Sequence, residues 1–467
     1  MLNHFNFRRW SDRDILITND LGRHDFLSLK EFQDFLKGNL EKTSNLYCRL
    51  REKHFLLEDE DIASDDLTHC LRSMKDYIFH GPALHIFVVT NQCNLQCVYC
   101  QAQQHHAKHK GFMTADIGRR AIDIALTSPE HRLSFEFQGG EPLLNFPVIR
   151  EIVKYAEERR GDKIIDFTIV SNFQLLTDDI ADFLLKHHVS ICTSLDGPRE
   201  LQERNRRSLG TASSYQKVID GMQLLARHGY KTGAIQTTTR YSLPYAREIV
   251  REYQRLGMTQ IFLRPLTPLG FAAEDWQQIG YAPEEFLSFY RTCFDEILKI
   301  NREGTLFKEQ HACIFLQKIL QGFSTNYMEL RSPCGAGVGQ LAYYYDGSIY
   351  TCDEARMVAE SGNQAFRLGD VYHSTLNDLV QGRTCRATCS ASILETLPGC
   401  SDCVYQPYCG VCPVIHLASH GDIFAKEING YRCKVYRGIL DYLFELLHQE
   451  DAGTLKILHS WIGDDES

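Results

Sequence analysis

The stretch Asn91-Gln92-Cys93-Asn94-Leu95-Gln96-Cys97-Val98-Tyr99-Cys100 carries three cysteines in a C-x3-C-x2-C spacing. It follows an apolar run at 85–90 that is typical of a strand, so the cysteines are expected on the loop after that strand. Three thiolates suit a [4Fe–4S] cluster that keeps one iron free for another ligand. The alternative is a zinc site that adds an imidazole from His105 or His106.

Composition sets the context for these cysteines. The chain has 467 residues, 17 of them cysteines, with 43% apolar and 24% charged residues, which indicates a globular protein and not a disulfide scaffold. A net charge of −10 gives no nucleic-acid footprint, and no apolar run is long enough to span a membrane. The N-terminus is too polar for a signal peptide, so we expect a cytoplasmic protein without nucleic-acid or membrane partners.

Strand-like and helix-like runs alternate through the middle of the chain. The expected strands are 85–90, 133–137, 164–170, 189–195, 232–239 and 260–266, and the expected helices are 114–126, 147–159, 178–187, 214–228 and 245–256. This alternation predicts parallel βαβ units, an α/β fold with a partial (β/α)6 barrel. Sites in such barrels gather at the carboxyl ends of the strands. Cys93, Gly139, Ser171 and Asp196 all fall at such ends.

Seven further cysteines lie near the C-terminus. They are Cys334, Cys352, Cys400, Cys403, Cys409, Cys412 and Cys433. A zinc ribbon would separate its two C-x2-C pairs by about 15–20 residues, much more than the gap between Cys403 and Cys409, so iron–sulfur chemistry is favoured.

Several motifs together resemble the radical S-adenosylmethionine (SAM) superfamily. Tyr99 precedes the third cysteine of the loop, and Gly139-Gly140-Glu141-Pro142 is similar to the GGEP element of that family. Ser171-Asn172 and Ser194-Leu195-Asp196-Gly197 follow in the family's order. The resemblance covers about residues 80–270 and implies that the cluster cleaves SAM to methionine and a 5′-deoxyadenosyl radical.

The resemblance also implies which residues contact SAM. These are Tyr99, Gly139, Gly140, Glu141, Ser171, Asn172, Asp196 and Arg264, while Cys93, Cys97 and Cys100 hold the cluster. Glycines lack Cβ, so their backbone can approach the methionyl group closely. Plainer alternatives stay open: Glu141 as a helix cap, Ser171-Asn172 and Asp196-Gly197 as ordinary turns, and Arg264 as half of a surface ion pair.

The C-terminal cysteines resemble the SPASM domain, which carries two auxiliary [4Fe–4S] clusters. That resemblance assigns Cys334, Cys352 and Cys412 to the first auxiliary cluster and Cys400, Cys403, Cys409 and Cys433 to the second, for three clusters in all. Only two residues separate Cys409 from Cys412, where the family has three. The first auxiliary cluster lacks a fourth ligand, which Cys313, Cys385 or Cys389 could supply, or the place could be open.

Asp353 directly follows Cys352. In the sulfatase-maturing branch that this pair resembles, an Asp at this place is proposed as a base, so Asp353 is the candidate catalytic residue. The alternative is an Asp that caps a helix.

Residues 1–80 predict strands at 7–17 and 25–29 around a turn, followed by helices at 29–38 and 44–53. This order resembles the winged-helix element that binds leader peptides by strand addition. A domain that only packs on the barrel is the alternative. We therefore expect a peptide-recognition domain at 1–80, the radical SAM barrel at 81–310, a SPASM domain at 311–440, and a C-terminal helix and tail at 441–467.

Within the superfamily, the segments at 15–28, 91–103 and 137–147 look like the His-Xaa-Ser system radical SAM maturase. This implies an enzyme that abstracts hydrogen from a ribosomally made precursor peptide and leaves a crosslink or another oxidative modification. Its implied partners are that peptide, a reduced flavodoxin or ferredoxin-type electron donor and a second radical SAM protein. The alternatives are a formylglycine-forming sulfatase maturase and a non-catalytic, zinc-stabilised peptide-binding protein.

Overall fold

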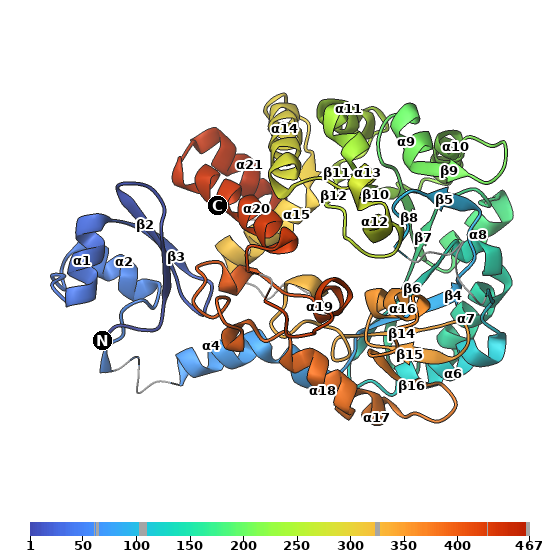
Figure 1. The fold of residues 1–467 in the computed structure, drawn as a ribbon, viewed down its shortest axis with the longest axis horizontal. Coiled ribbons are helices and arrows are strands. Elements are labelled where there is room, and N and C mark those ends of the chain that lie inside the picture. Colours follow the sequence, from blue (N-terminus) through green and yellow to red (C-terminus); the bar gives the residue numbers. More distant parts are fainter. Residues whose placement is uncertain (60, 62–64, 102–109, 323–326, 427, 464–467) are drawn as a thin grey trace.

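The computed structural model of the chain describes residues 1–59, 61, 65–101, 110–322, 327–426 and 428–463 (Figure 1). His105 and His106, the imidazoles of the zinc alternative, lie outside the described residues. In the described part of the chain, no helix is long and apolar enough to cross a membrane.

The N-terminal unit is a three-stranded antiparallel sheet in the order β1-β2-β3, followed by two helices that pack on it. Its elements are β1 (Asn6–Arg9), β2 (Asp14–Thr18), β3 (His24–Ser28), α1 (Leu29–Lys37) and α2 (Asn45–Glu52). The expected strand 7–17 is two strands, because the polar residues 11–13 turn the chain between β1 and β2. Helices α4 (Asp66–Lys75) and α5 (Tyr77–His80) then lead to the main sheet.

Six parallel strands form the barrel-like part of the main sheet, in the order β12-β10-β8-β7-β6-β4. They are β4 (Leu84–Thr90), β6 (Arg132–Gly139), β7 (Ile164–Ser171), β8 (Ser190–Ser194), β10 (Gly233–Thr237) and β12 (Leu263–Arg264). The covering helices are α6 (Ala115–Leu126), α7 (Phe146–Arg159), α8 (Asp178–Lys186), α10 (Ser214–Arg227) and α11 (Ala246–Arg255). This confirms the α/β fold with a partial (β/α)6 barrel.

Local sequence explains these elements. The Thr114 side chain accepts a hydrogen bond from the Ile117 N–H and caps α6, whose buried face includes Ala121 and Ile122. The expected last strand, 260–266, is divided into β11 (Gln260–Ile261) and β12. β11 pairs with β13 (Lys308–Glu309), whereas β12 pairs with β10, so the chain switches sheets between them.

The C-terminal region extends the same sheet. β14 (Gln340–Tyr343) adds in parallel to β4, and β15 (Ser348–Tyr350) and β16 (Arg367–Asp370) follow in antiparallel. Helices α16 (Asp353–Glu360), α17 (Leu376–Gln381), α18 (Arg383–Ser390) and α19 (Pro413–His420) complete this part. The chain then closes with α20 (Tyr431–His448) and α21 (Ala452–Ile462), which pack on α14 (Pro283–Arg302) and α15 (Gln310–Leu316) of the barrel (Figure 1). Two helices therefore stand where one was expected.

Candidate active site

One cavity of about 540 Å³ brings the two cysteine groups together. Its walls come from the carboxyl ends of the barrel strands on one side and from the C-terminal region on the other. The predicted site residues that line it are Cys93, Cys97, Tyr99, Cys100, Gly139, Gly140, Glu141, Ser171, Asn172, Arg264, Cys334, Cys352, Asp353 and Cys412. Asp196, Cys400, Cys403, Cys409 and Cys433 lie elsewhere.

The first cysteine loop is tied to the barrel by a short ladder. β5 (Leu95–Cys97) pairs antiparallel with β9 (Arg206–Ser208), so that Cys97 stands opposite Arg206. The Asn172 amide donates to the Asn94 side chain at 2.8 Å and lies 3.8 Å from the Cys93 sulfur. Burial, together with the field of Cys97, raises the pKa of Cys93 above its usual value. The loop therefore presents neighbouring thiols to the cavity.

This donor set fits a [4Fe–4S] cluster with one iron left free. Three thiols from one loop face a common space, and burial raises the pKa of Cys97 to about 12, so bound iron is what would hold the sulfur as a thiolate. Among the described residues, no three His, Cys, Asp or Glu side chains are grouped closely enough to hold a single metal ion.

Gly139 ends β6 beside the backbone of β4. Its φ is +150°, and a Cβ there would lie 2.2 Å from the Thr90 carbonyl oxygen. Only glycine fits such a contact. The sequence predicted that this glycine lets the backbone approach a cofactor. In the structure the missing Cβ lets β6 lie close to β4, and this contact shapes the cavity wall.

Glu141 joins the neighbouring strand ends through a carboxylate that is 1% exposed. It accepts hydrogen bonds from the Ser171 hydroxyl at 2.7 Å, the Asn172 N–H at 2.8 Å and the Leu143 N–H at 3.1 Å. The last of these caps the short helix η1 (Pro142–Asn145), so the capping alternative is confirmed. Burial outweighs these bonds and raises the pKa of Glu141 to about 7.

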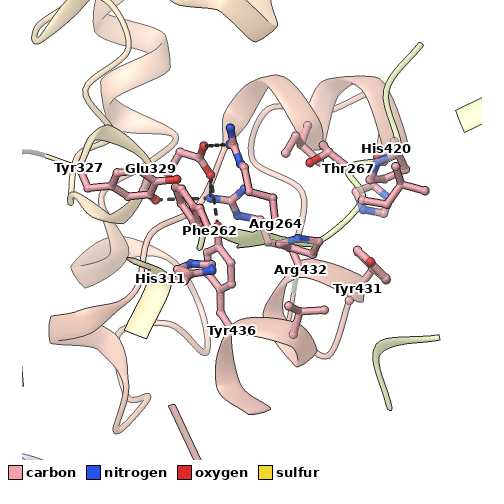
Figure 2. Close-up of a pocket in the computed structure, with 17 residues that line it drawn as sticks. Phe262, Arg264, Thr267, His311, Tyr327, Glu329, His420, Tyr431, Arg432 and Tyr436 are labelled. Carbon is pink, nitrogen blue, oxygen red and sulfur yellow. Dashed lines mark hydrogen bonds and ion pairs between the residues drawn. The ribbon is translucent and has the colours of Figure 1, made fainter. Parts of the chain in front are cut away.

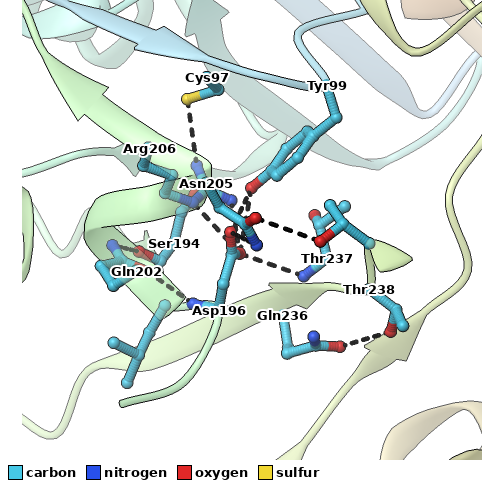
Figure 3. Close-up of polar contacts among 12 residues, drawn as sticks. Cys97, Tyr99, Ser194, Asp196, Gln202, Asn205, Arg206, Gln236, Thr237 and Thr238 are labelled. Atoms are coloured by element: carbon cyan, nitrogen blue, oxygen red, sulfur yellow. Dashed lines mark hydrogen bonds and ion pairs between the residues drawn. The ribbon is translucent and has the colours of Figure 1, made fainter. Parts of the chain in front are cut away.

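The structure does not place Asp196 where the sequence analysis expected it. It was expected to contact SAM or substrate, but it is 0% exposed and does not line the cavity. Its carboxylate accepts from the Tyr99 hydroxyl at 2.8 Å, from Arg206 at 3.1 Å and from the Asn205 amide at 3.1 Å (Figure 3). These contacts engage both oxygens of the carboxylate, so Asp196 holds Tyr99 and Arg206 in position from behind the cavity wall.

Arg206 is a site residue that the sequence analysis missed. Its guanidinium lines the cavity, lies 4.0 Å from the Cys97 sulfur and stands over the Tyr99 ring (Figure 3). The buried ion pair with Asp196 holds it there. The two residues are separated by helix α9 (Arg199–Asn205), so only the folded chain shows the pair.

Charged residues from both walls form ion pairs at the cavity. Arg264 forms an ion pair with Glu329 at 3.0 Å within the cavity wall, and Asp353 pairs with Arg356 at 2.8 Å. Asp353 is the first residue of α16, and its side chain does not cap that helix, so the capping alternative is wrong. Glu354 also lines the cavity, and burial raises its pKa.

The C-terminal cysteines divide into two sets. Burial raises the pKa of Cys352, and the fields of Glu354, Cys412 and Cys334 add to the rise. Burial raises the pKa of Cys409 to about 12, and the fields of Cys403, Cys433 and Cys400 act on it too. The sets that lie together are therefore Cys334, Cys352 and Cys412, and Cys400, Cys403, Cys409 and Cys433.

None of the three extra candidates for the fourth ligand is among the groups with the largest effects on the pKa of Cys334, Cys352 or Cys412. Cys313 lies in the barrel core, where the nearest charges are those of Glu309 and Lys308. Cys385 and Cys389 stand one turn apart on α18, and Cys385 accepts a hydrogen bond from Cys389 that lowers its pKa.

Comparison with known proteins agrees with this architecture. The Radical SAM superfamily model matches residues 87–245. The cysteine-type anaerobic sulfatase-maturating enzyme of Clostridium perfringens is 22% identical over 78% of this chain and 98% of its own length. The solved structure of native anSMEcpe with bound AdoMet matches with a TM-score of 0.68 at 19% identity, covering 78% of this chain and 98% of that one.

A second solved structure reaches further along the chain. Streptococcus suis SuiB, bound to its precursor peptide SuiA, matches with a TM-score of 0.55 at 14% identity, over 90% of this chain and 97% of that one. The motif order, the six-stranded parallel sheet and these matches agree. Residues 87–245 therefore form a radical SAM domain, and the chain shares its fold with anSMEcpe and SuiB, including the C-terminal region that follows the barrel.

Proposed function

We propose that the protein is a radical SAM maturase that abstracts hydrogen from a residue of a ribosomally made precursor peptide and leaves a crosslink or another oxidative modification. The observation that carries this proposal is the shared cavity, which has Cys93, Cys97 and Cys100 on one wall and Cys334, Cys352 and Cys412 on the other. A peptide in that space would touch both walls. A similar protein, SuiB, is described with a bound precursor peptide.

The first wall binds and orients the cofactors. A [4Fe–4S] cluster and SAM bound there supply a 5′-deoxyadenosyl radical. Cys93, Cys97 and Cys100 would hold the cluster, and the N–H donors of Asn172 and Arg206, which lie beside two of the sulfurs, would tune its reduction potential. Gly139, Gly140, Glu141, Ser171, Asn172, Tyr99 and Arg264 form the surface that SAM contacts.

The second wall would receive the electron and the proton that the substrate releases. We assign Cys334, Cys352 and Cys412 to one auxiliary cluster and Cys400, Cys403, Cys409 and Cys433 to another, for three clusters in all. Asp353 lies at the wall next to Cys352 with its carboxylate held by Arg356. We assign it the role of the base that accepts the proton released when a substrate radical is oxidised.

The N-terminal unit is the proposed site for a leader peptide. Its sheet packs directly on the second auxiliary set: the Asn6 amide donates to the Cys403 carbonyl at 3.2 Å, and the Thr18 hydroxyl donates to the Val404 carbonyl at 2.7 Å. An outer strand of such a sheet can add a peptide strand. A leader bound there would bring its core segment toward the cavity. A flavodoxin or ferredoxin-type donor and a second radical SAM protein complete the proposed partners.

Formylglycine formation is the second candidate. It is favoured by the Cys352-Asp353 pair and by the similarity to a sulfatase-maturating enzyme. The N-terminal sheet favours the peptide maturase instead, since leader recognition gives that sheet a use.

Co-expression separates the two. The protein is produced anaerobically with a short peptide encoded beside it, and peptide masses are compared with and without the enzyme. A loss of about two hydrogens together with 5′-deoxyadenosine supports the maturase. Conversion of a Cys- or Ser-containing sulfatase peptide to an aldehyde, with no change in the encoded peptide, supports the alternative. Zinc without iron or sulfide in the purified protein would rule out both candidate functions.

A further inference from the structure

A second, smaller cavity opens beside the first. Its volume is about 160 Å³, and it shares Arg264, Tyr327, Glu329 and Arg432 with the main cavity (Figure 2). It lies between the end of β12, helix α15 and the start of α20. A cavity of about 150 Å³ holds one benzene-sized ring, so this one has room for a single side chain.

Planar groups line much of this space. Phe262, Tyr327, Tyr431 and Tyr436 all face it (Figure 2). Aromatic walls favour another ring, since edge-to-face and offset contacts add to apolar burial. The shape and lining therefore suit an aromatic side chain better than a long aliphatic one.

The charged groups in the wall are two guanidinium groups and one carboxylate. Glu329 accepts from Arg264 at 3.0 Å, from Arg432 at 3.2 Å and from the Tyr436 hydroxyl at 3.2 Å. One carboxylate thus engages both guanidinium groups from inside the wall, and these three groups together carry one positive charge in excess.

His311 is the residue of this wall whose two polar side-chain atoms both lack a hydrogen-bond partner among the described residues. It is 2% exposed, stacks on Phe315 at 5.0 Å and stands edge-on to Phe262 and Tyr436. Neither of its ring nitrogens has a hydrogen-bond partner among the described residues. Burial lowers its pKa to about 3, so the ring is neutral and offers one donor and one acceptor. A buried polar group left unpaired is destabilising, and an occupant that hydrogen-bonds to it would remove that cost.

We propose that this cavity is a specificity subsite that takes an aromatic side chain with a polar atom in or attached to its ring, a phenol or an imidazole, from the peptide substrate, and that His311 recognises that atom. The assignment rests on the proposed function, because it names the side chain that would anchor the peptide next to the main cavity. His311 belongs to the binding wall and does not touch the reacting atoms.

Side-chain probes test this without a known substrate. N-acetyl-Gly-X-Gly-amide peptides, with X as Tyr, His or Phe, are titrated into the anaerobically reconstituted full chain, and binding is measured by ligand-observed NMR. The Tyr and His probes are expected to bind about tenfold more tightly than the Phe probe, the effect of one recovered hydrogen bond. His311→Phe keeps the stacked ring and is expected to abolish this preference.

The Phe probe controls for folding, because its affinity should be the same in the wild type and in His311→Phe. Equal binding of all three probes to the wild type would mean that water fills the cavity and would overturn the subsite. A preference that survives in His311→Phe would overturn the role of His311. Peptide modification is measured separately. If the probes are discriminated but no peptide is modified, the proposed function is rejected and the subsite is kept. If peptide is modified but the probes bind equally, the subsite is rejected and the proposed function is kept.

Discussion

The two cysteine groups of this protein are built in opposite ways. Cys93, Cys97 and Cys100 sit on one loop, pinned by the pairing of β5 with β9, and all three face one cavity. Within residues 400–412, Cys412 does not group with the three cysteines that precede it. It lies with Cys334 and Cys352 instead, because α16 packs against α19. A short loop determines its own ligand set, whereas an interleaved set is determined by tertiary packing.

Cys97→Ala should have the largest effect, because a loop of three thiols has none to spare. We expect no detectable 5′-deoxyadenosine from SAM under reductant, and a fall from about twelve irons to about eight per chain, since the auxiliary sets are independent. Iron analysis and chromatography of the reaction mixture measure both. Retention of SAM cleavage would refute the assignment of this loop.

Cys412→Ala and Cys409→Ala test the interleaving directly. The two cysteines lie three residues apart but belong to different sets. Each variant should lose one auxiliary cluster, and the electron paramagnetic resonance signals that disappear should differ between them. SAM cleavage should continue in both, with less modified peptide. Loss of the same signals from both variants would show that the run binds one cluster and that the interleaving is wrong.

The same contrast explains what could be predicted from the sequence. Alternation of apolar strands with capped helices determines the barrel, and loop cysteines at strand ends need no tertiary information. Arg206 was missed because its importance depends on Asp196 and Cys97, which lie on other elements. Asp196 was misplaced for a related reason: an Asp-Gly at a strand end looks the same whether its carboxylate faces the cavity or packs behind it.

Glu141 and Glu309 form a matched pair of buried carboxylates, one at the cavity and one in the scaffold. Glu309 accepts hydrogen bonds from the Tyr290 hydroxyl at 2.6 Å and the Ala312 N–H at 2.7 Å, and does not line the main cavity. Glu141→Gln places an amide where the Ser171 hydroxyl and Asn172 N–H donate, so SAM affinity should fall about tenfold. Glu309→Gln should leave SAM affinity unchanged; isothermal titration measures both, and equal losses would contradict a local role for Glu141.

Both carboxylates also predict a pH dependence. Burial raises the pKa of each to about 7, above the ordinary value of about 4.5. Between these two values the folded chain holds protons that the unfolded chain has released, so stability falls as pH rises from about 5 to 8. Glu309→Gln removes the share of this loss that belongs to Glu309, so the variant should gain up to about 3 kcal/mol relative to wild type over that range, while the share of Glu141 stays. Urea unfolding at about pH 5 and about pH 8 measures the change in stability of each protein. An identical dependence of stability on pH in the variant and the wild type would contradict the prediction.

The smallest effect is expected where the interleaved set lacks a fourth cysteine. Cys385 and Cys389 are one helical turn apart and hydrogen-bond to each other, so each thiol already has a partner on its own helix. Neither is among the groups with the largest effects on the pKa of Cys334, Cys352 or Cys412. Cys385→Ala, Cys389→Ala and the double variant should therefore keep about twelve irons per chain. Loss of about four irons from one single variant would assign that cysteine as the missing ligand, and it would mean that α18 moves toward Cys334 when iron binds.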